Sequence, residues 1–197
     1  MGGITTEILT GSGFDAGLDA VARLRIEVFR SFPYLYKGSL DYERRYLRKL
    51  KDARGAVIIV AREGSRIVGA STGLPLAEEH DEFKAPFLAQ GFDTSAIFYC
   101  AESVLAAPYR GQGLGHAFFD AREAHALGLG LAQSTFCAVV RAPDDPRRPP
   151  DYRPLDEFWT KRRYRPLKGV TATYSWAEIG DGEDETDHVL QFWMRDL

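Results

Sequence analysis

The 197-residue chain has little of several features that mark particular protein classes. It contains only two cysteines, Cys100 and Cys137, and both sit in apolar runs. That usage excludes a disulfide framework and is typical of reduced core residues in a cytoplasmic protein. No apolar run approaches the roughly 18–20 residues that a membrane-spanning helix needs, so we expect no membrane partner. The first residues lack a basic stretch followed by an apolar one, and we therefore expect no signal peptide.

An excess of basic residues is also absent. The chain has 25 Lys and Arg against 28 Asp and Glu, a net charge of −3 at pH 7. Proteins that bind nucleic acid generally carry a basic excess or stripe, so we expect no nucleic-acid partner. No cluster of His, Cys, Asp and Glu has the spacing of zinc ligands, and we expect no metal. The length and the 45% hydrophobic content predict one domain, residues 1–197, with a sizeable core.

The pattern of apolar residues predicts a mixed α/β domain around one sheet. The expected strands are residues 3–9, 56–61, 67–76, 97–105, 134–140, 170–179 and 188–197. The expected helices are residues 15–30, 40–50, 113–127 and 155–162, with Asp15 and Ser39 as N-caps of the first two. The second and third strands are expected to form a hairpin. Residues 77–95 are polar and contain Pro and Gly, so we expect a surface excursion there.

The segment that carries chemistry is a glycine-rich turn before the third helix, PYRGQGLG over residues 108–115. Glycines let a ligand approach the backbone, and the first amides of a helix have no partner inside it. Together with the helix dipole, such amides favour a pyrophosphate. The turn lacks the Gly-Lys-Ser/Thr ending of a P-loop and does not read G-x-G-x-x-G. The alternative is a tight turn that only packs the helix against the sheet.

This turn resembles the coenzyme A-binding motif of the GNAT acyltransferases, Gln/Arg-x-x-Gly-x-Gly/Ala. Arg110, Gly113 and Gly115 occupy its defining positions, and Tyr109 is a frequent companion. The order of the expected elements and the segment at residues 158–167 are also similar to that family, over nearly the whole chain. The resemblance implies an α/β fold with a mostly antiparallel sheet of about seven strands and about four helices. It also implies transfer of an acetyl group from acetyl-CoA to a primary amine of a small molecule or peptide, by direct attack in a ternary complex.

The same resemblance implies which residues bind acetyl-CoA. The backbone of Ser103, Val104 and Leu105 would pair with the pantetheine arm, and the Leu105 N–H would face the acyl oxygen. The pyrophosphate would be held by the turn and the helix start, which comprise Arg110, Gly111, Gln112, Gly113, Leu114, Gly115 and His116. This arrangement requires the strands at 97–105 and 134–140 to splay apart.

Three residues are the candidates for proton transfer. Glu102 lies in an otherwise apolar strand, where burial would raise its pKa toward the range useful for a base. We therefore expect it to accept the proton of the amine. The alternative is a structural carboxylate bonded to backbone or to Arg141. Tyr99 stands where some family members carry an acidic base, so it is expected at the reaction site or in the wall of the substrate cleft. The tyrosine that protonates the leaving thiolate in the family is replaced here by Trp159, which leaves Tyr164 or Tyr152 as a substitute. The alternative is that no acid is needed, since a thiolate is a tolerable leaving group.

An aromatic loop between the first two helices is the expected acceptor site. Phe32, Tyr34 and Tyr36 would line it, which suits an apolar or cationic substrate. Simple packing of the two helices is the alternative. The expected partner is a small-molecule amine. A homodimer, a longer acyl-CoA donor and a CoA-binding sensor without catalysis stay open.

Overall fold

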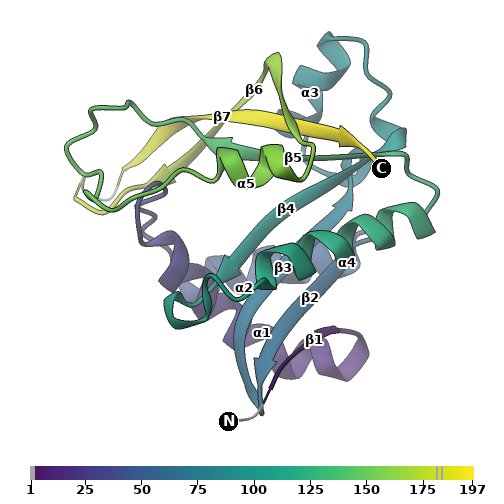
Figure 1. Ribbon diagram of the computed structural model, residues 1–197, viewed down its shortest axis with the longest axis vertical. Helices are drawn as coiled ribbons and strands as arrows, with labels where there is room; N and C mark the ends of the chain where they lie inside the picture. Colours follow the sequence, from purple (N-terminus) through teal and green to yellow (C-terminus); the bar gives the residue numbers. More distant parts are fainter. Residues whose placement is uncertain (1–2, 181, 183) are drawn as a thin grey trace.

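The computed structural model describes residues 3–180, 182 and 184–197, and its centre is a seven-stranded sheet (Figure 1). The strands lie in the order β1-β2-β3-β4-β5-β7-β6. Their bounds are β1 Ile4–Ile8, β2 Val57–Glu63, β3 Arg66–Pro75, β4 Ile97–Leu105, β5 Gln133–Val139, β6 Arg165–Ala177 and β7 Glu185–Asp196. All neighbours are antiparallel except β4 and β5. The predicted mixed, mostly antiparallel sheet is therefore confirmed.

Helices cover both faces of this sheet. They are α1 Gly11–Phe29, α2 Leu40–Asp52, α3 Asp81–Ala89, α4 Leu114–Gly128 and α5 Asp156–Lys161. One core cluster contains the buried side chains of α1, α2 and α3, such as Leu18, Leu47 and Phe87. A second cluster contains Phe118 of α4, and Phe158 of α5 packs against it. Figure 1 shows α4 in front of the sheet and α1 and α2 behind it.

The two expected helix caps have different outcomes. The hydroxyl of Ser39 accepts the amide of Tyr42 at 3.3 Å, so Ser39 caps α2 as predicted. The prediction of Asp15 as a cap is wrong, because α1 begins four residues earlier, at Gly11, after Thr10. The Asp15 carboxylate instead lies 3.1 Å from the ammonium group of Lys51. Residues 11–13 are Gly, Ser and Gly, so the spacing of apolar residues does not indicate the first turn of this helix.

The prediction of a surface excursion at residues 77–95 is also wrong, since this segment contains α3. Phe83 and Phe87 lie one turn apart on α3, and both are buried. The ring of Phe87 packs 5.6 Å from that of Phe92 and 4.8 Å from that of Phe192 in β7. Two buried rings anchor a helix whose other side chains are mostly exposed. Within the residues that the structure describes, the α-helices number five and not the expected four.

A bulge in β4 opens the middle of the sheet. Glu102 lies opposite Thr72, but Tyr99 lies opposite Leu74, so three steps along β4 match two along β3. An extra residue bends a strand and increases its twist. β4 pairs with β5 only as far as Tyr99 and Thr135, and beyond the bulge the two strands separate. The splay that the family resemblance required is therefore present.

Within the residues that the structure describes, no helix is long and apolar enough to cross a membrane.

The packing of α3 gives a stability test. We expect Phe87→Ala to lower the free energy of unfolding by about 3–5 kcal/mol, because it empties a fully buried ring position. Leu88→Ala on the same helix is the matched control: Leu88 is 58% exposed, so its loss should stay within about 0.5 kcal/mol. Urea unfolding measures both. Equal losses would show that α3 does not pack on the sheet in solution.

Candidate functional site

The unpaired edge of β4 beyond the bulge forms one wall of the site. The Ala106 amide donates to the carbonyl of Val68 in β3 at 3.0 Å. Because successive residues of a strand direct their amides and carbonyls to opposite sides, those of Leu105 and Ser103 face the gap between β4 and β5. The backbone of Val104 faces β3 by the same alternation, so its expected pairing with a ligand in the gap is a correction. The backbone groups of Ser103 and the amide of Leu105 remain available to an extended ligand.

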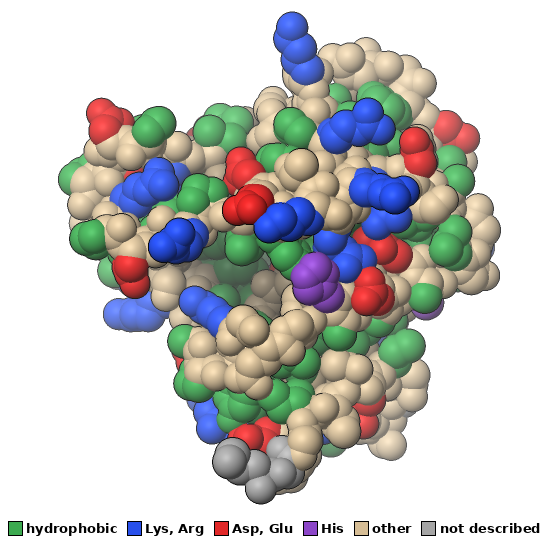
Figure 2. Space-filling model, in the orientation of Figure 1, with side chains coloured by type: hydrophobic (Ala, Val, Ile, Leu, Met, Phe, Trp, Pro, Cys, Tyr) green, Lys and Arg blue, Asp and Glu red, His purple; other side chains and the backbone are tan. Residues whose placement is uncertain are grey.

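The glycine turn before α4 forms the second wall. Gly111 and Gly113 have φ angles of +74° and +83°, which side-chain-bearing residues rarely adopt, and Gly113 is the N-cap of α4. Within the described part of the chain, the amides of residues 111–115 donate to no other group. A Cβ added to Gly113 would meet nothing within 4 Å, so these amides border open space. Figure 2 shows a hollow on this face of the molecule, with Lys and Arg side chains at its rim.

The other residues of the motif have partners of their own. The Arg110 Nε donates to the Leu105 carbonyl at 3.2 Å, and the Gln112 side chain donates to the Pro108 carbonyl at 3.0 Å. The amide of His116 donates to the Gly113 carbonyl at 2.9 Å, and its ring lies 3.2 Å from Arg162 and against Phe158. The expectation that the His116 amide holds a phosphate is therefore corrected, since the first turn of α4 already uses it.

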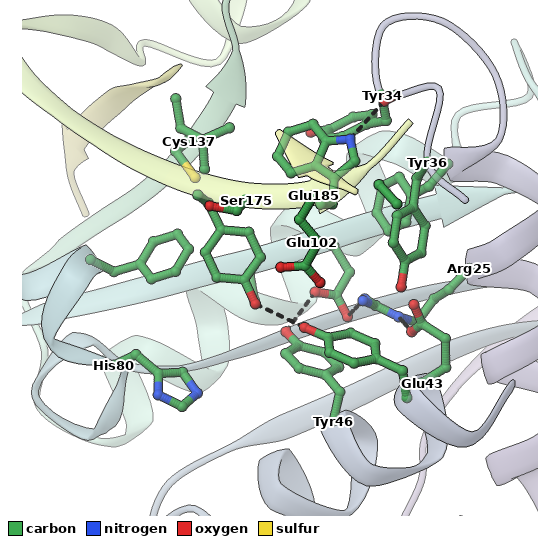
Figure 3. A pocket seen from close by; sticks show the side chains of 18 of the residues that line it. Arg25, Tyr34, Tyr36, Glu43, Tyr46, His80, Glu102, Cys137, Ser175 and Glu185 are labelled. Carbon is green, nitrogen blue, oxygen red and sulfur yellow. Dashed lines mark hydrogen bonds and ion pairs between the residues drawn. The ribbon is translucent and has the colours of Figure 1, made fainter. Parts of the chain in front are cut away.

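A pocket of about 260 Å³ lies on the opposite face of the sheet, toward α1 and α2 (Figure 3). Much of its wall is aromatic, with the rings of Phe29, Tyr34, Tyr36, Tyr42, Tyr46, Phe83, Tyr99, Tyr174 and Trp176. Ala101 and Glu102 of β4 and Cys137 of β5 also line it. Because β4 and β5 are the two splayed strands, the pocket reaches the gap from behind.

Glu102 lies in this pocket as part of a buried charge network. Its carboxylate forms an ion pair with Arg25 of α1 and accepts a hydrogen bond from the Tyr46 hydroxyl at 2.9 Å. The same guanidinium binds the fully buried Glu43 of α2. Burial opposes the charge of Arg25, but the nearby carboxylates outweigh this and raise its pKa. The partner of Glu102 is thus Arg25 and not Arg141, whose guanidinium binds Glu178.

The aromatic loop is fixed over the pocket by β6. The Lys37 amide donates to the Ala177 carbonyl at 2.8 Å, and the Ile179 amide donates to the Leu35 carbonyl at 2.8 Å. Tyr34 and Tyr36 lie in the pocket wall. Phe32 does not, because its ring packs against Tyr152, 4.7 Å away. The expected substrate contact of Phe32 is therefore corrected.

Two tyrosines considered for proton transfer have very different environments. The Tyr99 hydroxyl lies 3.2 Å from the Cys137 Sγ across the opening of the gap, and burial raises the pKa of Tyr99. Tyr164 is 0% exposed in the core on the α4 side, where its hydroxyl bonds Ser134 at 2.7 Å and Glu123 at 3.0 Å. Its expected role as an acid is corrected, since the core seals it from the pocket.

The remaining candidates for an acid also lie elsewhere. Trp159 packs against Phe136 and Trp193 on the α4 side. Tyr152 contacts Phe32 and does not line the pocket. Among the described residues, no group of three or more His, Cys, Asp or Glu side chains is arranged to hold a metal ion.

Sequence reasoning missed many residues of the pocket, among them Arg25, Glu43, Tyr46 and Glu79. A signal existed for two of them. Arg25 follows Val21 by one helical turn, and Glu43 precedes Leu47 by one turn, so each charge stands on the apolar stripe of its helix. A charged residue at a core position usually has a buried partner. No comparable signal marks Glu79 within its polar segment.

Solved structures of acetyltransferases have a fold similar to that of this chain. An acetyltransferase of the GNAT family from Streptococcus pneumoniae aligns with a TM-score of 0.58 at 10% identity, over 99% of this chain and 100% of that one. A ribosomal-protein-alanine N-acetyltransferase from Brucella melitensis aligns with a TM-score of 0.64 at 12% identity, over 98% and 99%. A Salmonella typhimurium protein, assigned as an acetyltransferase and solved with its cofactor acetyl-CoA, aligns with a TM-score of 0.62 at 10% identity, over 99% and 94%. No family model and no curated protein sequence matches the chain.

The glycine turn gives a test of anion binding. We expect Gly113→Val to weaken acetyl-CoA binding by about tenfold or more, because its side chain would stand where the pyrophosphate approaches the amides of the turn. Losing one hydrogen bond to a charged group costs about 1.5–3 kcal/mol. Gly130→Val is the matched control at the other end of α4. It has a φ of +78° and the same open surroundings, so both variants should lose similar stability. Calorimetric titration measures the affinities. Equal affinity of the two variants would place the anion site elsewhere.

Proposed function

We propose that this chain, which has the fold of the GNAT N-acetyltransferases, transfers the acetyl group of acetyl-CoA to the primary amine of a small molecule. The observation that carries the proposal is the convergence of three features at one gap in the sheet. They are the unpaired edge at Ser103 and Leu105, the free amides at residues 111–115, and the pocket that reaches the same gap from behind. A donor and an acceptor could thus enter from opposite faces and meet between β4 and β5.

The residues present suit coenzyme A. An extended pantetheine arm with amide groups can pair with a free strand edge, and a pyrophosphate suits free amides at a helix start. Arg110 now donates to the Leu105 carbonyl, so we propose that its guanidinium turns to the phosphates when that carbonyl takes a ligand amide. Acetyl-CoA would supply the activated thioester, and the Leu105 N–H would donate to the acyl oxygen as it gains negative charge.

Conversion of an ammonium into an amide requires two protons to leave the nitrogen, one before it attacks and one after the new N–C bond has formed. The nitrogen of the amine forms a bond to the thioester carbon, the C–S bond breaks, and the sulfur leaves as a thiolate. We propose that Glu102 accepts the ammonium proton, with Arg25 and Tyr46 holding its carboxylate in place. The Tyr99 hydroxyl spans the opening of the gap and is the proposed donor to the leaving thiolate. The second proton, lost by the nitrogen once the N–C bond has formed, balances the proton that Tyr99 gives to the sulfur.

A CoA-binding sensor is the second candidate, and Trp159 in place of the family's acidic tyrosine favours it. Calorimetric titration with acetyl-CoA, desulfo-CoA and ATP, followed by acetyl transfer to a panel of amines, separates the two. We expect saturable binding of acetyl-CoA but not of ATP, and turnover with at least one amine. Tight acetyl-CoA binding without turnover would favour the sensor, and no binding would refute both.

The proposed base gives a more specific prediction. Glu102→Gln should lower kcat by about 100-fold or more, the usual contribution of general acid–base catalysis. Acetyl-CoA affinity and melting temperature should be measured alongside, because this substitution also alters the Arg25 ion pair. Glu82→Gln, at an exposed position on α3, is the control and should change none of these. Unchanged kcat in Glu102→Gln would remove Glu102 from the mechanism.

A further inference from the structure

We propose that the pocket admits its acceptor as a cation: a primary ammonium on an aromatic or apolar body that carries no acidic group, bound through the carboxylate of Glu79. This inference rests on the proposed acetyl transfer for the fate of the amine, but the cation site itself depends only on the pocket. It narrows the acceptor from any primary amine to one chemical class.

The charges of the pocket favour a cation. Four carboxylates line it, from Glu43, Glu79, Glu102 and Glu185, against two permanently cationic side chains, Arg25 and Lys37. Arg25 is engaged by Glu43 and Glu102 together, and the Lys37 ammonium lies 3.3 Å from the carbonyl of Gly182. The lining therefore has an excess of negative charge where an acceptor would bind.

Glu79 is the carboxylate best placed to meet an incoming ammonium. It follows the 3-10 turn Leu76–Glu78 at the end of β3, and its side chain is only 9% exposed. Its ion-pair partner is the His80 imidazole, whose Nε2 lies 4.0 Å from Oε1, too far for a hydrogen bond. Oε1 also accepts the His80 amide at 2.9 Å, which fixes the carboxylate without neutralising it.

Glu79 is one of the residues that line the pocket, and its charge acts on several of the others. Besides burial, its negative charge contributes to the raised pKa values of Tyr46, Tyr99, Cys137 and Tyr174. These four residues belong to α2, β4, β5 and β6, which surround the pocket. Glu79 lines the same pocket as these four residues, so an ammonium bound there would meet both its carboxylate and the aromatic wall.

The aromatic wall and the volume define the rest of the acceptor. Aromatic ring faces attract cations and pack well against a flat or apolar body. A volume of about 260 Å³ is below the range of about 300–1,000 Å³ of typical ligand pockets, so the buried part of the acceptor is small. An acidic group beside the amine would face the four carboxylates, and burying it without a free cation would be costly.

The first test compares ligands with one frame and different charge. Calorimetry without a coenzyme, so that no transfer occurs, measures binding of 2-phenylethylamine, 2-phenylethanol and phenylalanine to the wild-type chain. We expect the amine to bind about tenfold more tightly than the alcohol, because it adds a hydrogen bond between charged groups, and phenylalanine to bind more weakly than the amine. Equal binding of amine and alcohol, stronger binding of phenylalanine, or no binding of the amine would overturn the proposal.

The second test isolates Glu79. Glu79→Gln keeps the size of the side chain and removes its charge, and we expect about a tenfold loss of affinity for 2-phenylethylamine with unchanged affinity for 2-phenylethanol. Glu78→Gln is the matched control, since the neighbouring Glu78 is exposed and lies outside the pocket lining. A similar loss in both variants, or none in Glu79→Gln, would contradict the assignment of Glu79.

The two proposals fail in distinguishable ways. Charge-selective amine binding that depends on Glu79, in a chain that binds no acetyl-CoA, would refute acetyl transfer and leave the cation site standing. Acetyl transfer to phenylalanine or to a peptide N-terminus, at a higher kcat/KM than to 2-phenylethylamine and with no effect of Glu79→Gln, would refute the cation site and leave the transferase standing.

Discussion

The bulge in β4 between Tyr99 and Glu102 is the constraint on which the rest of the structure depends. A regular β4 would pair with β5 along its whole length, and the sheet would have no gap. The bulge ends that pairing at Tyr99, and it also leaves carbonyls that need donors. The buried Arg122 of α4 supplies them, since its Nη1 donates to the Glu102 carbonyl at 2.9 Å and to the Thr72 carbonyl at 3.2 Å. One helix thus provides both the free amides at its start and the side chain that stabilises the bulge.

A single guanidinium organises the other side of the gap. Arg25 of α1 binds Glu43 of α2 and Glu102 of β4, so three elements distant in sequence converge on one buried charge. Its guanidinium also lies 4.4 Å from the centre of the Tyr46 ring, whose hydroxyl binds Glu102. Buried charges are costly unless they are paired and hydrogen-bonded, and an apolar core would stabilise these helices at least as well. The network is therefore better explained by the fixed carboxylate it places beside the gap than by stability.

The sequence predicted those features whose physical requirements are local. The turn at residues 108–115 needs glycines with positive φ before a helix, and the hairpin of β2 and β3 needs two apolar runs around a short turn. Both can be read from a few neighbouring residues. The pocket could not be predicted in this way, because its wall combines residues from α1, α2, β4, β5, β6 and the segment after β3. Tyr164 illustrates the difference: it follows α5 closely in sequence, yet its ring turns into the core on the α4 side, a choice that packing alone decides.

The two faces of the gap also have opposite electrostatic character. On the α4 side, free amides and the positive end of the helix dipole favour an anion such as a pyrophosphate. On the α1 and α2 side, Glu79 and the partly neutralised Glu43 and Glu102 favour a cation. Each substrate of the proposed reaction would therefore be attracted to its own face and repelled from the other. Such a separation of charge would keep the donor of the proposed reaction out of the acceptor pocket, and an ammonium would reach the thioester only through the splayed strands.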